Sequence, residues 1–337
     1  MGRKPTLHSV AERAGVSVAT ASQVLRQTGR ISAATRKRVI SAAEQLNYVR
    51  DSRAASMRSG ENREIGLVIH EIANPFNAEV ISGISDFLEA EDYLVSVLDS
   101  QNDNKREERN LRAFIAGGRS GIIWVPSADV LDQTTRLLLT NNVPTITFLN
   151  SFPDSPFDHV GIRNARATYE GTSHAISLGH RKIAYFGGTG SSYVRRERMR
   201  GYCEAIAEHD LGPPVIWDCE DTKLAASAAM SEFCQAHPDI TAVMCNGDRV
   251  ALGACLSLTQ HNKAIGRDMS VIGIDDITDA ALSDPPLSTM AVSPIELGRQ
   301  LARTLISRIK SPDQPQVHVD VTAELMVRQT TGAPLDD

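Results

Sequence analysis

Positive charge and hydrogen-bonding side chains are concentrated in the first 60 residues. This segment has 11 Lys and Arg against three acidic residues, a net charge of +8, whereas residues 61–337 have 24 basic and 38 acidic residues, a net charge of −14. Basic side chains that neutralise phosphates release counterions, so this charge on a small module is typical of a protein that binds duplex nucleic acid. The alternative is a solvated bundle of Lys- and Arg-rich helices.

Three short helices are predicted to position these charges. Apolar residues recur at helical spacing in each: Val10, Ala11 and Ala14; Ala21, Val24 and Leu25; and Val39, Ala42, Ala43 and Leu46. Thr6 and Ser17 can cap the first two helices, and Gly15 permits a sharp turn between them. Residues 36–38, all basic, fall on the polar face of the third helix, which runs from about Ser32 to Leu46. This is the helix-turn-helix pattern.

From Ile65 onward, apolar segments alternate with helical patterns. The predicted strands are Ile65–Ile69, Leu94–Leu98, Gly121–Val125, Thr145–Phe148, Lys182–Phe186, Ala242–Cys245 and Ser270–Ile274. The predicted helices between them are Phe76–Glu91, Lys105–Ala116, Ala165–Leu178, Arg196–His209, Lys223–Ala236 and Val250–His261. Strands that are apolar on both faces indicate parallel sheets covered by helices. Because the strands are too many for one sheet, we expect two α/β lobes.

Polar and aromatic side chains follow several of these strands. Ligands of such sheets bind at the carboxyl ends of the strands, and Phe76, Asn150 and Asp275 all stand there. Arg198 lies in the helix after the fifth strand. Its guanidinium and the carboxylate of Asp275 suit a hydroxylated ligand. Taken singly, Asp275 could instead cap the next helix, and Arg198 could be a surface residue.

The sequence gives little support for a nucleotide-binding loop, a metal site or a catalytic site. Residues 187–190 (Gly-Gly-Thr-Gly) fit neither a Walker loop nor the dinucleotide fingerprint, and no Gly-x-Ser-x-Gly is present. The nine histidines show no pair at ligand spacing, and the five cysteines lack metal-type spacing, so we predict no metal, no cofactor and no catalysis. The sequence shows no signal peptide and no run of 18 apolar residues, so we expect a cytoplasmic protein without a membrane partner.

Residues 6–25, residues 30–39 and Leu46-Asn-Tyr48 resemble the DNA-binding headpiece of the LacI/GalR family of transcriptional regulators, and the resemblance continues to the C-terminus. It implies a helix-turn-helix headpiece joined to a two-lobed α/β core like that of periplasmic binding proteins. Details at residues 29–32, 48–50 and 201–203 resemble the maltose-regulon repressor branch.

The resemblance assigns DNA contacts to the second helix. Val18, Ala19 and Gln23 would contact base edges, Ser17, Thr20 and Ser22 would contact phosphates, and Thr6 and Arg26 belong to the same DNA-binding set. The family commonly has Arg at the position of Gln23. Arg pairs with guanine whereas Gln pairs better with adenine, so we expect a half-site that differs at that base pair. A phosphate contact is the alternative for Gln23.

Residues 51–63 match the family's hinge, which folds on DNA and inserts an apolar side chain into a minor-groove step. Met57 stands where the family usually has Leu, next to Arg53 and Arg58, and a thioether can still act as the wedge. Arg50-Asp51 and Ala54-Ala55 depart from the family's Pro-Asn and Ala-Arg. An ordinary disordered tether is the alternative.

In the family, the positions of Phe76, Asn150, Arg198 and Asp275 line the effector cleft. Two positions depart from the pattern. Asn246 lies one place before Gly247-Asp248, where the family has Asn-Asp, and we include Asn246 in the effector set. Residues 220–222, Glu-Asp-Thr, replace an aromatic residue, so the effector cannot be inferred from typical sugar-binding members. Trp217 is more typical of a core or edge-strand residue than of a substitute.

The resemblance also implies the domain organisation and a dimer. We expect a DNA-binding domain over 1–50 and the hinge over 51–63, then an N-lobe over 64–164 to which 291–322 return. A C-lobe would span 165–290, with about 323–330 returning. Residues 283–303 resemble the segment that precedes the helix of the core dimer. One small helix-turn-helix contacts one half-site, so a homodimer on a near-palindromic operator is expected.

The sequence therefore predicts a sequence-specific DNA-binding repressor whose affinity for its operator is set by a small-molecule effector bound between two α/β lobes. A sugar or sugar derivative is one candidate for this effector. A solute-binding protein for transport would share the core, but the basic first 60 residues argue against it. A sugar-modifying enzyme would need an acid/base pair or a phosphate loop, and neither is found.

Overall fold

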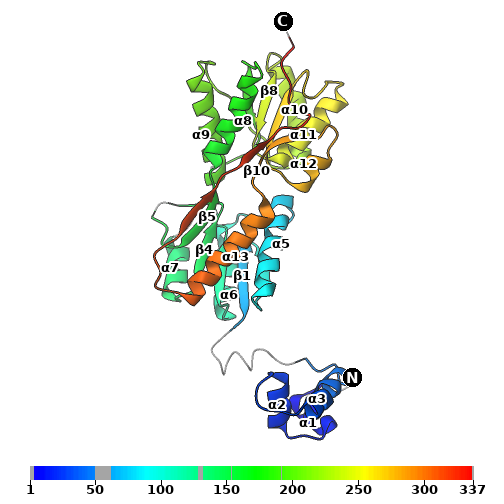
Figure 1. Cartoon of the computed structure of the whole chain (residues 1–337). Coiled ribbons are helices and arrows are strands. Elements are labelled where there is room, and N and C mark those ends of the chain that lie inside the picture. Colours follow the sequence, from blue (N-terminus) through cyan, green and yellow to red (C-terminus); the bar gives the residue numbers. More distant parts are fainter. Residues whose placement is uncertain (1–3, 50–61, 128–131, 153, 191, 336–337) are drawn as a thin grey trace. The chain divides into compact units, whose positions relative to one another are not determined.

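The computed structural model describes residues 4–49, 62–127, 132–152, 154–190 and 192–335. The chain divides into two compact units, residues 1–62 and residues 63–337 (Figure 1). Within the described part of the chain, no helix combines the length and the apolar character needed to cross a membrane.

In the first unit, which we call the head, the described residues 4–49 form a bundle of three helices: α1 (Leu7–Ala14), α2 (Val18–Leu25) and α3 (Ala33–Gln45). As predicted, Thr6 and Ser17 accept hydrogen bonds from backbone N–H groups in the first turns of α1 and α2. Gly15 ends α1 with φ at +62°, a conformation that costs a glycine little. The predicted apolar faces of the three helices meet in one small core.

In the second unit, the N-lobe is built on a six-stranded parallel sheet. Its strands are β1 (Glu64–Ile69), β2 (Leu94–Asp99), β3 (Gly121–Trp124), β4 (Thr145–Phe148), β5 (Asp158–Ile162) and β11 (His318–Val321), in the order β11-β5-β4-β3-β1-β2. Helices α5 (Pro75–Ala90) and α13 (Pro294–Lys310) pack on one face, and α6 (Asn104–Ala116) and α7 (Asp132–Thr140) cover the other.

Two glycines bring α5 and α13 into backbone contact. A Cβ atom added to Gly83 would lie 2.0 Å from the carbonyl oxygen of Ile295, and one added to Gly298 would lie 2.1 Å from that of Val80. Each helix therefore presents a glycine to the backbone of the other. This close approach packs α5 and α13 as one layer on the N-lobe sheet.

The C-lobe has a second six-stranded sheet, in the order β12-β10-β9-β8-β6-β7. Its strands are β6 (Ile183–Phe186), β7 (Val215–Trp217), β8 (Ala242–Cys245), β9 (Ser270–Asp275), β10 (Ser288–Ala291) and β12 (Glu324–Met326), and only β12 runs antiparallel to its neighbour. The surrounding helices are α8 (Asn164–Ser177), α9 (Tyr193–Glu208), α10 (Lys223–Ala236), α11 (Asp248–Gln260) and α12 (Thr278–Leu282).

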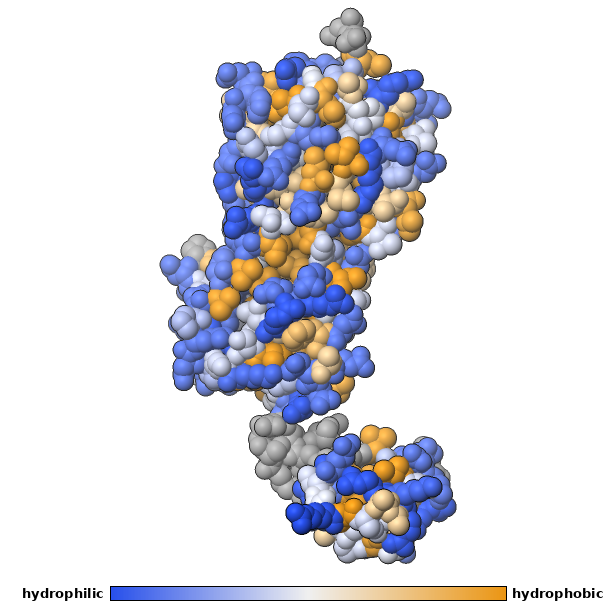
Figure 2. All heavy atoms as spheres, in the orientation of Figure 1, coloured by the Kyte–Doolittle hydropathy of each residue, from blue (hydrophilic) through white to orange (hydrophobic). Residues whose placement is uncertain are grey.

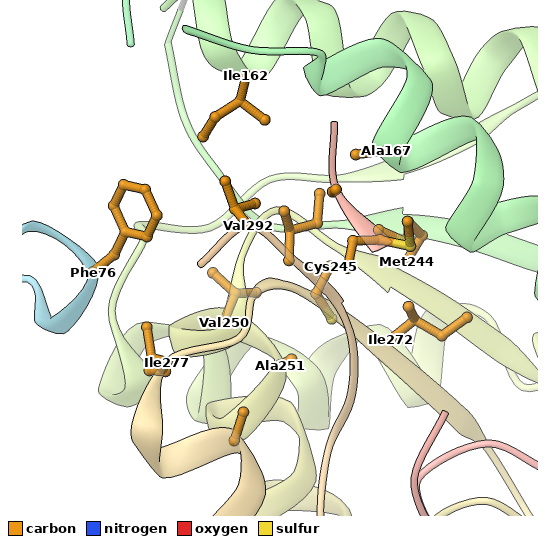
Figure 3. Packing of buried hydrophobic residues seen from close by; sticks show 14 of the residues in the cluster. Phe76, Ile162, Ala167, Met244, Cys245, Val250, Ala251, Ile272, Ile277 and Val292 are labelled. Atoms are coloured by element: carbon orange, nitrogen blue, oxygen red, sulfur yellow. The ribbon is translucent and has the colours of Figure 1, made fainter. Parts of the chain in front are cut away.

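The chain passes between the two lobes three times: from β5 to α8, from β10 to α13, and from β11 to β12. One continuous hydrophobic cluster extends through both lobes. Figure 3 shows part of it. In this view Phe76 of the N-lobe lies on the left, Met244 and Ile272 of the C-lobe lie on the right, and Ile162 and Val292 lie between them. The second, smaller cluster fills the other face of the N-lobe sheet around Trp124 and Phe114.

The predicted fold class, a helix-turn-helix head followed by a two-lobed α/β core with parallel sheets, is confirmed. All seven predicted strands form, with ends shifted by at most a residue or so. The sequence analysis did not identify β5, β7, β10, β11, β12, α7 or α12. These elements are short, and several carry too many polar residues to give a periodic pattern.

Candidate functional site

The predicted base-contacting residues lie together on the exposed side of α2. Val18, Ala19 and Gln23 are exposed, and Val18 keeps 40% of its surface accessible although it is apolar. The opposite side of α2 carries Ala21 and Val24, which are buried in the head's core. The helix therefore presents one face that the described residues 4–49 leave uncovered.

Of the predicted phosphate contacts, Ser17 and Thr20 lie at the start of α2 and Ser22 lies farther along the same helix. Ser17 Oγ accepts the Thr20 N–H at 3.1 Å and lies 2.8 Å from the Thr20 hydroxyl. Ser22 and Arg26 are linked by a bond from the Arg26 Nε–H to the Ser22 carbonyl at 3.3 Å. Thr6 caps α1. Neither α1, α2 nor α3 has an acidic residue in its first turn, so all three helix N-termini keep the positive potential that suits a phosphate. The predicted hinge contacts Arg53 and Met57 lie outside the described residues.

A cavity of about 550 Å³ lies between the N-lobe and the C-lobe. Its walls come from the segments that follow the carboxyl ends of the strands, as expected for parallel sheets. All five predicted effector residues line it: Phe76, Asn150, Arg198, Asn246 and Asp275. The Phe76 ring is stacked on Phe148, with ring centroids 6.5 Å apart, and supplies an apolar wall.

Arg198 is fixed by three partners and is buried, so it is not a surface residue. Its Nε–H donates to Asn164 Oδ1 at 2.8 Å, one Nη donates to the Asn246 carbonyl, and Nη2 lies 3.1 Å from Asp275 Oδ1. Tyr185 in turn donates its hydroxyl to Asn246 Oδ1 at 2.6 Å. These bonds hold the guanidinium, the amide and the carboxylate in fixed positions at the wall of the cavity.

Asp275 does not cap α12, whose N-cap residue is Ile277. It ends β9 with φ at +121°, and Asp276 follows at +57°, so the backbone is strained where the carboxylate faces Arg198. Burial raises the pKa of Asp275 to about 6, and the Arg198 guanidinium limits that rise. Strain and burial at one carboxylate are typical of a functional position.

Several buried polar atoms of the cavity wall have no hydrogen-bond partner among the described residues. They are His70 Nδ1, Asn77 Oδ1, Asn150 Oδ1, Arg195 Nε and Asp221 Oδ1. An unsatisfied buried polar group costs about 1–3 kcal/mol, so these atoms favour a ligand that offers both donors and acceptors. Burial lowers the pKa of His70 to about 4, so its ring is neutral at pH 7.

The cavity wall carries more acidic than basic groups. Glu71, Asp99, Asp221 and Asp275 face it, against Arg195 and Arg198. Although burial opposes ionisation of Asp99, bonds from the N–H groups of Gln101, Glu71 and Ile72 outweigh it and lower its pKa. The cavity therefore disfavours an additional anion.

The sequence analysis missed His70, Asp99 and Arg195 as lining residues. His70 and Asp99 stand at the ends of β1 and β2, so the strand-end rule that selected Asn150 would have found them. Asp221 lies in the segment where the family has an aromatic residue. Trp217, in edge strand β7, does not line the cavity; its ring packs on that of Phe233 in α10, with the two ring centroids 5.6 Å apart.

Comparison with known proteins gives matches along most of the chain. The family described as "Bacterial regulatory proteins, lacI family" matches residues 6–51, and the "Periplasmic binding protein-like domain" matches residues 172–331. The maltose regulon regulatory protein MalI of Escherichia coli K12 is 30% identical over 96% of this chain and 98% of its own length. The HTH-type transcriptional repressor PurR of Aliivibrio fischeri strain MJ11 is 30% identical over the same shares.

Solved structures agree with these matches. The Lac repressor dimer bound to operator and the anti-inducer ONPF has a TM-score of 0.86 at 25% identity, covering 98% of this chain and 100% of that one. The complex of the transcriptional regulator CelR with cellobiose has a TM-score of 0.73 at 27% identity, covering 97% and 99%.

Proposed function

This chain belongs to the lacI family of bacterial regulatory proteins, and from that membership we infer how it recognises an operator and an effector. It is a DNA-binding transcriptional repressor with an effector-binding core, not an enzyme. We propose that it acts in the cytoplasm, where operator DNA is found.

We propose that the exposed face of α2 contacts the operator. Val18, Ala19 and Gln23 lie in the major groove, and the hydroxyls of Ser17 and Thr20 approach phosphates together with the helix N-terminus. The observation that supports this assignment is the exposed face of α2 within a segment, residues 1–60, of net charge +8. Arg53 and Met57 belong to the same proposal as minor-groove contacts.

The proposed active form is a homodimer, because one head contacts only one half-site. Three exposed leucines of the C-lobe support a shared apolar face: Leu224 on α10 is 83% exposed, Leu256 on α11 53% and Leu282 on α12 77%. Lys223 and Asp279 pair at 2.5 Å and join α10 to α12 at this place. On the face shown in Figure 2, the second unit (residues 63–337) also exposes hydrophobic side chains.

The proposed effector is an uncharged sugar or sugar derivative. The arrangement that carries this proposal is Arg198, Asn246 and Asp275 fixed at one wall, with Phe76 as an apolar wall and unpartnered donors and acceptors around them. Hydroxyl groups satisfy both donors and acceptors, and a sugar ring can lie against an aromatic face. The excess of carboxylates argues against a phosphate ester.

Cleft closure around the effector would change the spacing of the two hinges in the dimer. Operator affinity and effector affinity are then coupled reciprocally through the equilibrium between open and closed cores.

A thermal-shift screen tests the effector proposal. The panel contains uncharged mono- and disaccharides, phosphate esters of the same sugars, and nucleobases. We expect the stabilising compound to be an uncharged sugar, and its shift to be lost in Arg198→Ala and Asp275→Ala. A phosphate ester as the best compound, or a shift that survives both substitutions, would contradict the proposed cleft.

A further inference from the structure

Two histidines and an aspartate meet at the edge of the N-lobe sheet, outside the effector cavity. Strands β5 and β11 pair in parallel, with His159 opposite His318 and Gly161 opposite Asp320. Alternate residues of a strand point to the same face, so all four lie on one face of the sheet. The rings of His159 and His318 have centroids 4.8 Å apart. The candidate ligand atoms of the three side chains all lie within 4.8 Å of one another.

Hydrogen bonds fix the tautomer of the buried His159. The Thr147 hydroxyl donates its one hydrogen to the Asp158 carbonyl oxygen at 3.1 Å. The contact of 2.9 Å between Thr147 Oγ1 and His159 Nδ1 must therefore be donated by an Nδ1–H. This leaves Nε2 with its lone pair. A histidine oriented through Nδ1 with a free Nε2 is the usual form of a metal ligand.

The free nitrogen lies against Gly161, where a side chain would collide with it. A Cβ atom added to Gly161 would lie 2.5 Å from His159 Nε2 and 2.7 Å from Asp320 Oδ1. His318 Nε2 lies 3.3 Å from the other oxygen of Asp320. Among these four positions of β5 and β11, Gly161 is the one without a side chain, and the two imidazole nitrogens and the carboxylate lie around it.

We propose that His159, His318 and Asp320 bind a divalent transition-metal ion of the zinc, cobalt or nickel type. Two imidazole nitrogens with one carboxylate are a donor set for these ions, whereas magnesium and calcium prefer oxygen alone. Bonds of about 2.0–2.2 Å in a tetrahedral site place ligand atoms about 3.3 Å apart. The side chains of His318 and Asp320 are 54% and 35% exposed and are free to move inward by that difference, while His159 stays fixed.

Neither the spacing of the histidines nor the effector cavity gives any sign of this site, because the register between two segments far apart in the sequence creates it. Without a metal, His318 and Asp320 would be an ordinary surface pair, worth little. That alternative leaves the lone pair of His159 Nε2, which faces the same two side chains, without a ligand. The ion would join edge strand β11 to β5, next to two of the three connections between the lobes.

Metal binding to the full-length protein, freed of any histidine tag, tests the proposal. Zinc is titrated by calorimetry and cobalt by its visible absorption, which reports nitrogen and oxygen ligation directly. We expect one ion per chain. His318→Asn and Asp320→Asn should each weaken binding at least about 100-fold, the upper range seen for loss of a supporting residue alone. The exposed His209, in the C-lobe, provides the matched control His209→Asn, which should bind as the wild type does.

A second variant keeps all three ligand side chains but places a methyl group against two of them. Gly161→Ala should weaken zinc binding while circular dichroism shows an intact fold. Zinc should also raise the Tm of the wild type but not that of Asp320→Asn. Absence of an ion in the wild type, or wild-type affinity for zinc in both His318→Asn and Asp320→Asn, would overturn the proposal. Operator affinity without metal should be unchanged in both variants, so this result is independent of the proposed function.

Discussion

Glu71 of the N-lobe and Arg249 of the C-lobe form an ion pair, with Oε1 2.8 Å from Nη2. A second contact lies close by, where Glu79 Oε1 accepts the N–H and the hydroxyl of Thr278 at 3.0 and 2.9 Å. The first contact joins the segment after β1 to the C-lobe, and the second joins α5 to the C-lobe. They exist only while the lobes are close together, so they stabilise the closed core.

The first prediction concerns this ion pair. Arg249→Gln should favour the open core and lower the affinity for the effector by up to about fivefold, since a partly exposed pair contributes at most about 1 kcal/mol. Calorimetric titration with the sugar found in the screen measures the change. Glu71 also lines the cavity, so a double-mutant cycle with Glu71→Gln separates the pair from direct ligand contacts. Additive effects would exclude the pair as a coupling element.

Gln23 is predicted to determine one base pair of each half-site. Selection from a randomised operator library should return adenine opposite wild-type Gln23 and guanine opposite Gln23→Arg. Arg26→Ala serves as the control. We expect this basic residue of the DNA-binding set to contact a phosphate, so its loss should weaken all operators alike and reduce the salt slope by about 1. An unchanged preferred operator in Gln23→Arg would mean that Gln23 contacts phosphate only.

The exposed leucines of the C-lobe are predicted to lie in the dimer interface. Leu282→Glu and Leu224→Glu should each shift the dimer toward monomer, because a buried, unpaired carboxylate is costly. Analytical ultracentrifugation measures this shift. Leu139, which is 51% exposed on α7 of the N-lobe, provides the matched control Leu139→Glu. Dissociation by the control alone would place the interface elsewhere.

Gly83→Ala is predicted to destabilise the N-lobe, contrary to helix propensity. In an open helix this change adds about 1 kcal/mol of stability. Here the new Cβ would lie 2.0 Å from the Ile295 carbonyl, and overpacking costs about 1–3 kcal/mol. Chemical denaturation gives the sign of the change. A gain in stability would show that α5 and α13 separate easily.

Asp248 is predicted to make stability depend on pH. Its carboxylate is buried and accepts the Thr289 hydroxyl at 2.6 Å and the Ile277 N–H at 3.0 Å. Burial and the charge of Asp275 raise its pKa well above the ordinary 3.8. The folded protein therefore holds this proton more tightly than the unfolded chain, and the contribution of Asp248 to stability declines as pH rises above about 4.

Asp248→Asn removes this titration, and its amide can satisfy both partners if the Thr289 hydroxyl turns. The free energy of unfolding of the wild type, relative to Asp248→Asn, should fall as the pH rises above about 4, until the pH passes the raised pKa of Asp248. Urea denaturation at several pH values measures it, with the exposed Asp92→Asn as baseline. A difference that stays constant with pH would contradict the raised pKa.

The helix caps and the residues at the strand ends could be predicted from the sequence, because they depend on local sequence and on the general geometry of parallel sheets. The caps Thr6 and Ser17 act within one turn, and the polar residues after strands converge because the carboxyl ends of parallel strands share an edge. Features set by long-range pairing could not be predicted. β5 contains Asp158 and His159, and its burial depends on Arg308, whose Nη2 lies 2.7 Å from Asp158 Oδ1. Nothing near Asp158 in the sequence indicates that partner, so the strand reads as a loop.

The three connections between the lobes have a mechanical consequence. Two bodies joined by one flexible chain can both slide and turn, whereas three short links at one side remove sliding and leave little more than rotation about an axis through the links. The core then has close to a single degree of freedom. One pair of spectroscopic labels placed across the cavity would suffice to record the state of the whole core.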